Sequence, residues 1–100
     1  MGKGRTKYGK TDANQAEIVE ALRGLGYCTV HSLHAVGGGV PDLLVGIGGR
    51  NYLVEVKDGS KPPSARKLTP DQVDWHRDWL GSVHVFDNVR DVVQWAQSMR

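Results

Sequence analysis

The sequence predicts an α/β domain whose elements follow the order α, β, β, β, α, β, α along the chain. Three features predict it: two adjacent apolar runs separated by a glycine pair, apolar residues at helical spacing near both ends, and a balanced composition. The chain has 100 residues, of which 39% are hydrophobic and 24% are charged. These proportions are typical of one globular domain and exclude a disordered tail.

The first half of the chain is predicted to hold a helix and a short strand. The helix spans residues 12–25, and apolar residues at positions i, i+4 and i+7 mark its buried face. These residues are Ile18, Leu22 and Leu25. Asp12 or Asn14 is suited to cap the start of the helix. Residues 27–33 follow as a strand, because they are rich in β-branched and aromatic side chains.

The middle of the chain carries the strongest signal. Two β-branched runs, 41–47 and 51–57, flank Gly48 and Gly49. A two-residue glycine turn between such runs predicts a β-hairpin. Just before this hairpin, the glycines at 37–39 are expected either to form a turn or to let another backbone segment pass close by.

The second half of the chain predicts a helix, a strand and a final helix. A polar loop at 59–68 leads to Thr69, which caps a helix running from Pro70 to about Leu80. Trp79 is expected in the core. Residues 83–86 form a strand, and an asparagine then caps a helix with one apolar face. That capping residue and face are Asn88, Val89, Val92, Val93 and Ala96.

The outer organisation of the chain is simple. Residues 1–10 carry four basic residues and no acid, which predicts a flexible basic arm before a single domain at 11–100. Cys28 is the only cysteine, so neither an internal disulfide nor a cysteine-based zinc site is possible, and a reducing cytoplasm is expected. No apolar run is long enough for a membrane span.

The turn position fixes which residues face each other across the hairpin. If Gly48 and Gly49 form the turn, opposed residue numbers sum to 48 + 49 = 97. Asp42 is then opposite Glu55, because 42 + 55 also equals 97, and Lys57 lies on the same face two residues further on. Two opposed carboxylates repel each other. They therefore require compensation, which Lys57 and a bound cation would supply.

The residues around the carboxylates indicate the kind of cation. Leu44 and Leu53 are apolar on the carboxylate face, so the hairpin is expected to be buried on both faces, as in an α/β layer. Oxygen ligands without a nearby cysteine or histidine suit a hard cation, Mg²⁺ or Mn²⁺. A surface Asp with an ordinary Glu–Lys pair is the alternative explanation of the same residues.

These motifs resemble a known nuclease family. Pro41 and Asp42 followed by Glu55, Val56 and Lys57 match the PD-(D/E)xK nuclease signature. The stretches DANQAEIVEALR, AVGGGVPDLLVG, LVEVKDGSKPPS and LTPDQVDWH resemble the stand-alone, phage-type virus-type replication-repair nuclease family, VRR-NUC. The resemblance implies a restriction-endonuclease-like core, αβββαβ(α), with a central mixed four-stranded sheet flanked by helices.

The resemblance also implies roles for individual residues. Asp42 and Glu55 would bind Mg²⁺ or Mn²⁺ with help from the main-chain carbonyl of Val56, and Lys57 would orient water or stabilise charge. Gln72 matches a glutamine that follows the catalytic hairpin, and Glu17 matches an acid on the first helix. Both have a capping alternative: Gln72 completes a Thr69 capping box, and Glu17 lies three residues after Asn14.

Basic residues cluster in two places that are expected to contact DNA. The arm and the loop after the hairpin hold seven of the 13 Lys and Arg residues. The predicted phosphate contacts are Lys7, Lys10, Lys61, Arg66 and Lys67. A solvated loop and a disordered arm are the alternatives.

Three functions follow from these expectations. The first is a Mg²⁺-dependent structure-specific DNA endonuclease resembling a Holliday-junction resolvase, acting as a homodimer in the cytoplasm of a bacterial host. The second is a nuclease for flaps, nicks or ends during phage replication. The third is a non-catalytic DNA-binding module with the same fold. The dimer and the junction are implied by the resemblance alone.

Overall fold

The computed structural model describes residues 13–100 and has the predicted element order. Helix α1 spans Gln15–Gly24, and strand β1 spans Cys28–Ser32. Strands β2 (Leu43–Ile47) and β3 (Arg50–Val56) form the hairpin. A 3₁₀ turn, η2 (Pro63–Ala65), precedes α2 (Pro70–Asp78), which is followed by β4 (Val83–Phe86) and α3 (Val89–Met99). The predicted basic arm at 1–10 lies outside the described residues.

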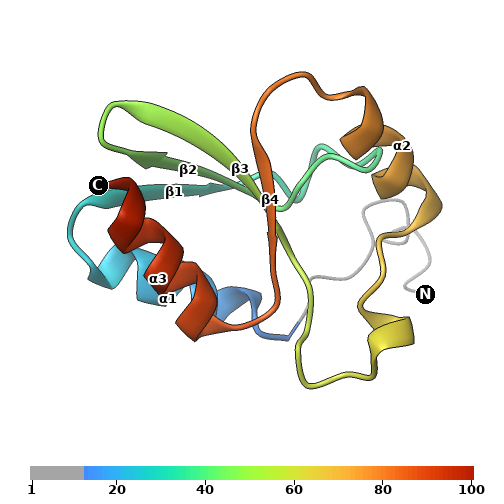
Figure 1. The fold of residues 1–100 in the computed structure, drawn as a ribbon, viewed down its shortest axis with the longest axis horizontal. Helices are drawn as coiled ribbons and strands as arrows, with labels where there is room; N and C mark the ends of the chain where they lie inside the picture. The colour runs from blue at the N-terminus through green and yellow to red at the C-terminus, as the bar shows by residue number, and fades with distance from the viewer. Residues whose placement is uncertain (1–12) are drawn as a thin grey trace.

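The four strands form one mixed sheet in the order β1-β2-β3-β4. Strand β2 is antiparallel to both β1 and β3, whereas β4 runs parallel to β3. Helices α1 and α3 lie side by side against the sheet, and α2 stands apart beyond the end of β3 (Figure 1). This arrangement is the α/β architecture that the sequence predicts.

The hairpin has the predicted register. Leu43 pairs with Val54 and Ile47 pairs with Arg50, so each observed pair sums to 97. Gly48 and Gly49 have φ values of 58° and 81°. A two-residue turn with positive φ at both positions matches the right-handed twist of the flanking strands, and glycine adopts it without strain.

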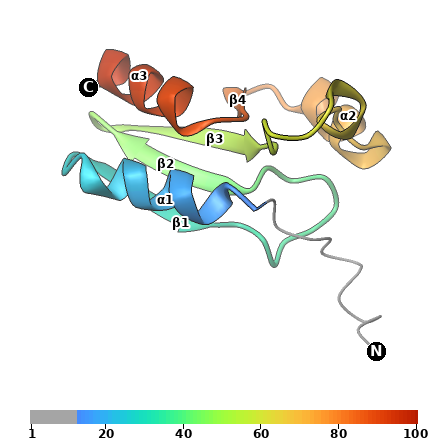
Figure 2. The ribbon, with the colours of Figure 1, turned by 90° about the horizontal axis from the view of Figure 1, so that it is seen from below.

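One face of the sheet makes the hydrophobic core with α1 and α3. Figure 2 shows the two helices running along the sheet, while α2 lies at its far end. Side chains that alternate along β2 and β3 pack against the buried stripes of both helices. The fully buried members are Ile18, Leu22, Leu43, Val45, Val54, Val56, Val92 and Ala96.

The opposite face is less covered than the sequence predicts. Leu44 and Leu53 are only half-buried, and Val85 on the neighbouring strand β4 is 47% exposed. Burial on this face is confined to the end near α2, where Glu55 is 1% exposed. The prediction that the hairpin is buried on both faces is therefore only partly correct. Leu44 and Leu53 on the second face keep part of their surface in contact with water.

Helix α2 also corrects the placement of Trp79. The sequence places Trp79 in the core, but it ends α2 with 44% of its surface exposed and stacks on Trp75 with ring centroids 4.8 Å apart. No residue of α2 is buried. The two tryptophans partly cover each other, and α2 contacts the end of the sheet through the polar side chain of Gln72.

A histidine in the aromatic cluster under α3 predicts a pH-dependent stability. His84 contacts the rings of Tyr52, Phe86 and Trp95, and this burial lowers the pKa of His84 below its ordinary value of 6.5. The unfolded chain therefore binds a proton more readily than the folded chain. The stabilisation is complete above pH 6.5 and is lost as the pH falls below it.

Chemical denaturation at a series of pH values between about 7.5 and 5.5 tests this expectation. We expect the free energy of unfolding to decrease across this interval. The decrease should be smaller in His84→Phe, which keeps an aromatic ring without the titrating nitrogen. Identical pH dependence in the two proteins would show that His84 does not contribute.

Candidate nuclease site

The two predicted metal ligands lie on the two arms of the hairpin, near its open end. Asp42 lies one residue before β2, and its Oδ2 accepts a hydrogen bond of 2.7 Å from the N–H of Val56. Glu55 is the neighbouring residue on β3. The structure thus brings the Asp42 carboxylate to the backbone of Val56. The N–H of Val56 stabilises the negative charge of Asp42, in addition to the lysine and cation that the sequence predicts.

A lysine and a glutamine complete this end of the sheet. Gln72 donates from Nε2 to Glu55 Oε2 over 2.9 Å, and its Oε1 accepts from Lys57 Nζ over 2.7 Å. Lys57 Nζ lies 3.9 Å from Glu55 Oε2. Glu55 and Lys57 are 1% and 8% exposed. A buried carboxylate and a buried ammonium are therefore held together by one amide side chain, which is how buried charges avoid a large desolvation cost.

Gln72 forms the predicted capping box and, with the same side chain, contacts Glu55 and Lys57. The N–H of Gln72 donates to Thr69 Oγ1 over 3.3 Å, and Gln72 Oε1 accepts from the N–H of Thr69 over 2.9 Å. These reciprocal bonds form a capping box at the start of α2. The same Oε1 also binds Lys57. The cap therefore fixes the side chain that bridges Glu55 and Lys57.

His76 lies one helical turn after Gln72 and was not singled out by the sequence. Burial lowers the pKa of His76, and the positive charge of Lys57 lowers it further. Its Nε2 is buried without a hydrogen-bond partner among residues 13–100. The spacing of four residues from Gln72 is the signal that could have placed it on the same helix face.

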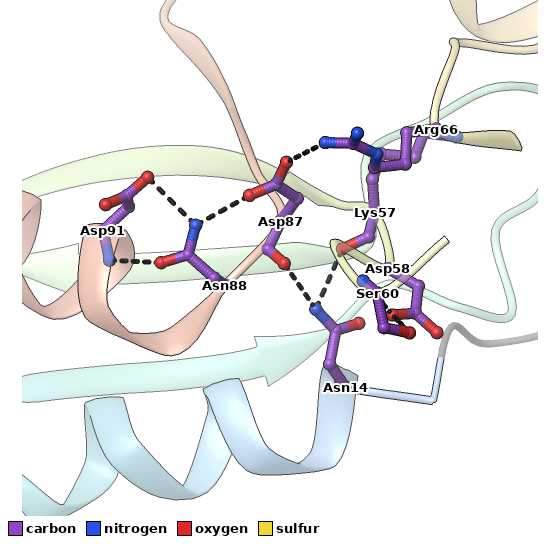
Figure 3. Close-up of polar contacts among 8 residues, drawn as sticks. All are labelled: Asn14, Lys57, Asp58, Ser60, Arg66, Asp87, Asn88 and Asp91. Carbon is purple, nitrogen blue, oxygen red and sulfur yellow. Dashed lines mark hydrogen bonds and ion pairs between the residues drawn. The ribbon is translucent and has the colours of Figure 1, made fainter. Parts of the chain in front are cut away.

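Asn14 ties the start of α1 to the residues that directly follow β3 and β4. Its Nδ2 donates to the carbonyl of Lys57 over 2.9 Å and to the carbonyl of Asp87 over 3.1 Å (Figure 3). Asn14 occupies the predicted N-cap position of α1, but its side chain makes no capping bond, and Asp12, the other predicted cap, lies outside the described residues. The backbone at Lys57 is instead held by an amide from a residue 43 positions earlier.

Glu17 lies beside a cleft between α1 and the segments that follow β3 and β4. It is exposed on α1 and lines an open cleft of about 440 Å³ together with Asp58, Arg66 and Asp87. The Asp58 carboxylate is turned toward Ser60 (Figure 3), whose hydroxyl and N–H lower the pKa of Asp58. The lining of this cleft does not include Asp42 or Glu55.

The predicted DNA contacts have different surroundings. Arg66 donates to Asp87 Oδ2 over 3.1 Å, so its guanidinium fastens the loop after β3 to the segment between β4 and α3 (Figure 3). Lys61 and Lys67 are exposed in the same loop. Lys7 and Lys10 lie outside the described residues.

The donor set fits a hard divalent cation with a partial protein shell. Asp42 and Glu55 offer carboxylate oxygens, and the carbonyl of Val56 lies on the same strand edge as its N–H, which binds Asp42. Among residues 13–100, no three Asp, Glu, His or Cys side chains form a metal-binding group. Two carboxylates and a carbonyl suit Mg²⁺, which keeps several of its waters when it binds proteins.

Comparison with known proteins identifies a similar domain. A solved structure described as a VRR_NUC domain matches with a TM-score of 0.57 and 28% sequence identity. The match covers 86% of this chain and 92% of the other. No family model and no curated protein matches the sequence. None of the helices in the described part of the chain has the length and apolar character needed to cross a bilayer.

Proposed function

The chain belongs to the VRR-NUC family and has a nuclease fold of the PD-(D/E)xK type, and from this premise we propose that it is a Mg²⁺-dependent DNA endonuclease. The observation that carries the proposal is the buried Glu55–Gln72–Lys57 arrangement beside Asp42. A protein that only binds DNA gains nothing from a carboxylate and an ammonium that are buried together, because their desolvation is unfavourable.

We assign the metal to the oxygen atoms at the end of the hairpin. Asp42, Glu55 and the carbonyl of Val56 would hold Mg²⁺ or Mn²⁺. When bound, the metal would polarise a phosphate oxygen and lower the pKa of a coordinated water. Glu17 is not assigned to this set, because it lines the cleft with Asp58 and Asp87, and no three metal-binding side chains gather among residues 13–100.

Lys57 contributes a positive charge next to the phosphate. Gln72 holds its ammonium through Oε1, leaving other N–H donors of the same group for a phosphate oxygen or a water. Such a preorganised cation stabilises the negative charge that develops in the transition state. Lys57 is proposed as an electrostatic group and not as the base, because a lysine must lose its proton to act as one.

The basic loop after β3 is proposed to bind the DNA backbone through Lys61 and Lys67. Both side chains are exposed, whereas Arg66 is engaged by Asp87. Each phosphate contact releases bound counterions and makes affinity depend on salt.

We therefore expect Lys67→Met to weaken DNA binding and to reduce the slope of log affinity against log salt by about one. Fluorescence anisotropy of a labelled DNA, measured over a range of salt concentrations without metal, checks this. Arg50→Met is the matched control, because Arg50 is an exposed cation at the opposite end of β3. A slope change of equal size in both variants would exclude a specific contact at Lys67.

The proposed substrate is branched DNA, and the proposed assembly is a homodimer. A four-way junction has two-fold symmetry, and a dimer with two sites matches it. A panel of labelled junctions, flaps, nicked duplexes and linear duplexes, incubated with Mg²⁺, tests the substrate. Paired cuts in the junction support a resolvase-like enzyme, and faster cleavage of flaps or nicks supports the replication-nuclease alternative.

A non-catalytic module of the same fold is the remaining alternative. Calorimetric titration with Mn²⁺ discriminates, because an enzyme of this type binds the ion at Asp42 and Glu55, whereas a module needs no metal. Heat of binding that disappears in Asp42→Asn supports the enzyme. Absence of binding in the presence and absence of DNA favours the module.

A further inference from the structure

The loop before Asp42 makes a close backbone contact with the start of α2. Gly37, Gly38 and Gly39 all have positive φ, at 70°, 66° and 86°. A Cβ atom on Gly39 would overlap the carbonyl oxygen of Asp71 and would lie 2.7 Å from its carbonyl carbon. It would also lie 3.1 Å from the backbone nitrogen of Gln72. The contact is with backbone atoms, which cannot rotate away as a flexible side chain would.

Both sides of this contact lead directly to the proposed site. Asp42 follows Gly39 by three residues, and its carboxylate binds the N–H of Val56. On the other side, Gln72 binds Glu55 and Lys57 through its side chain. The distance between Gly39 and the first turn of α2 therefore helps to set how far Gln72 reaches toward the hairpin.

We infer that Gly39 is a positioning residue, whose missing side chain lets α2 approach closely enough for Gln72 to bridge Glu55 and Lys57. This inference rests on the proposed nuclease function for its kinetic consequences, but the contact itself is independent of activity. The sequence predicts that the glycines at 37–39 either form a turn or let another backbone segment pass close by. The contact of Gly39 with Asp71 and Gln72 is such a close passage.

Gly38 provides a matched control within the same loop. Its φ of 66° makes alanine strained there too, but a Cβ on Gly38 would meet nothing within 4 Å. Gly38→Ala therefore reproduces the backbone strain of Gly39→Ala without the collision with Asp71 and Gln72. A difference between the two variants reports the collision alone.

The kinetic test is a double-mutant cycle on DNA cleavage. We expect Gly39→Ala to lower kcat by about a hundredfold with little change in KM, because small displacements of catalytic groups have effects of that size. In a Gln72→Ala background, the same change should lower kcat by no more than about twofold, since the lost bridge leaves nothing to displace. Equal kcat in Gly39→Ala and Gly38→Ala, or fully additive losses, would overturn the inference.

Nuclear magnetic resonance supplies two readouts that do not depend on activity. The first needs only the wild type, and the second is read in variants whose dispersed amide spectrum shows that they are folded. In the wild type, the α-protons of Gly39 should show a nuclear Overhauser effect to the amide proton of Gln72. The side-chain amide protons of Gln72 should shift to solvent-like values in Gly39→Ala but not in Gly38→Ala. An absent Overhauser effect or an unmoved amide resonance contradicts the contact, whereas a wild type with this contact and no cleavage contradicts only the nuclease proposal.

Discussion

Glu55→Gln should reduce DNA cleavage by about a thousandfold or more, because the site would lose a metal-binding charge worth several kcal/mol in the transition state. The glutamine has nearly the same volume and still offers an oxygen to Gln72 Nε2, so the packing at the end of β3 is retained. The substitution also removes a buried charge, since Glu55 is only 1% exposed. It also leaves the buried Lys57 ammonium without the carboxylate that lies 3.9 Å from it, so some loss of stability accompanies the loss of cleavage. Denaturant unfolding checks that the variant is folded under the assay conditions.

Single-turnover cleavage with saturating enzyme measures this effect separately from DNA binding. Glu20→Gln is the matched control, because Glu20 is an exposed charge on α1 outside the hairpin. We expect the control to cut DNA at the wild-type rate. Wild-type rates in Glu55→Gln would remove Glu55 from the site.

Gln72→Ala should lower both cleavage and stability. The cleavage rate should fall by about a hundredfold, because Lys57 and Glu55 lose the amide that orients them. The free energy of unfolding should fall by about 1 kcal/mol or more, because half of the capping box is lost and two buried polar groups lose a partner. Single-turnover cleavage and denaturant unfolding measure the two effects.

Thr69→Ala separates the structural role of Gln72 from its role in the site. It removes the Oγ1 acceptor of the capping box, which should cost about 1 kcal/mol of stability. It leaves the bonds from Gln72 to Glu55 and Lys57 in place. Cleavage by Thr69→Ala should stay near the wild-type rate. A loss as large as that of Gln72→Ala would show that Gln72 affects cleavage only through the helix cap.

The hairpin was predictable because its register depends on local chemistry. Gly48 and Gly49 favour the positive φ values that a two-residue turn requires, and the turn position then sets every pair up to Leu43 and Val54. The bond from the Val56 N–H to Asp42, at the open end of the same hairpin, agrees with this register. The helix starting at Pro70 was equally local, because Thr69, Pro70 and Gln72 form a recognisable start signal.

The remaining features depend on contacts between segments far apart in the sequence. Asn14 has the residue type of a helix cap, and its use as a donor to Lys57 and Asp87 requires the ends of two strands to meet it. Arg66 was predicted to bind phosphate from its place in a basic loop. In the fold, its guanidinium donates to Asp87, which is 21 residues away in the sequence. Trp79 was expected in the core, but its place after the last residue of α2 leaves it 44% exposed and stacked on Trp75.

The small net charge of +2 does not argue against DNA binding. Asp42 and Glu55 would be partly neutralised by a cation. On α2, Asp74 and Asp78 are paired with Arg77 through bonds of 3.0 Å and 2.9 Å. Short-range pairing of this kind reduces the field that acids would exert on a phosphate backbone. The exposed lysines in the loop after β3 therefore affect DNA binding more than the net charge of the whole chain does.

Cleavage of a labelled four-way DNA junction, compared in Mg²⁺ and in excess EDTA, tests the metal-dependent site at Asp42 and Glu55 most directly. We predict paired strand cuts in Mg²⁺ that disappear in EDTA and return when Mg²⁺ or Mn²⁺ is restored. Equal cleavage with and without the metal would contradict the proposed chemistry. Intact DNA under every condition, with the junction and with the other substrates of the panel, would contradict the nuclease itself.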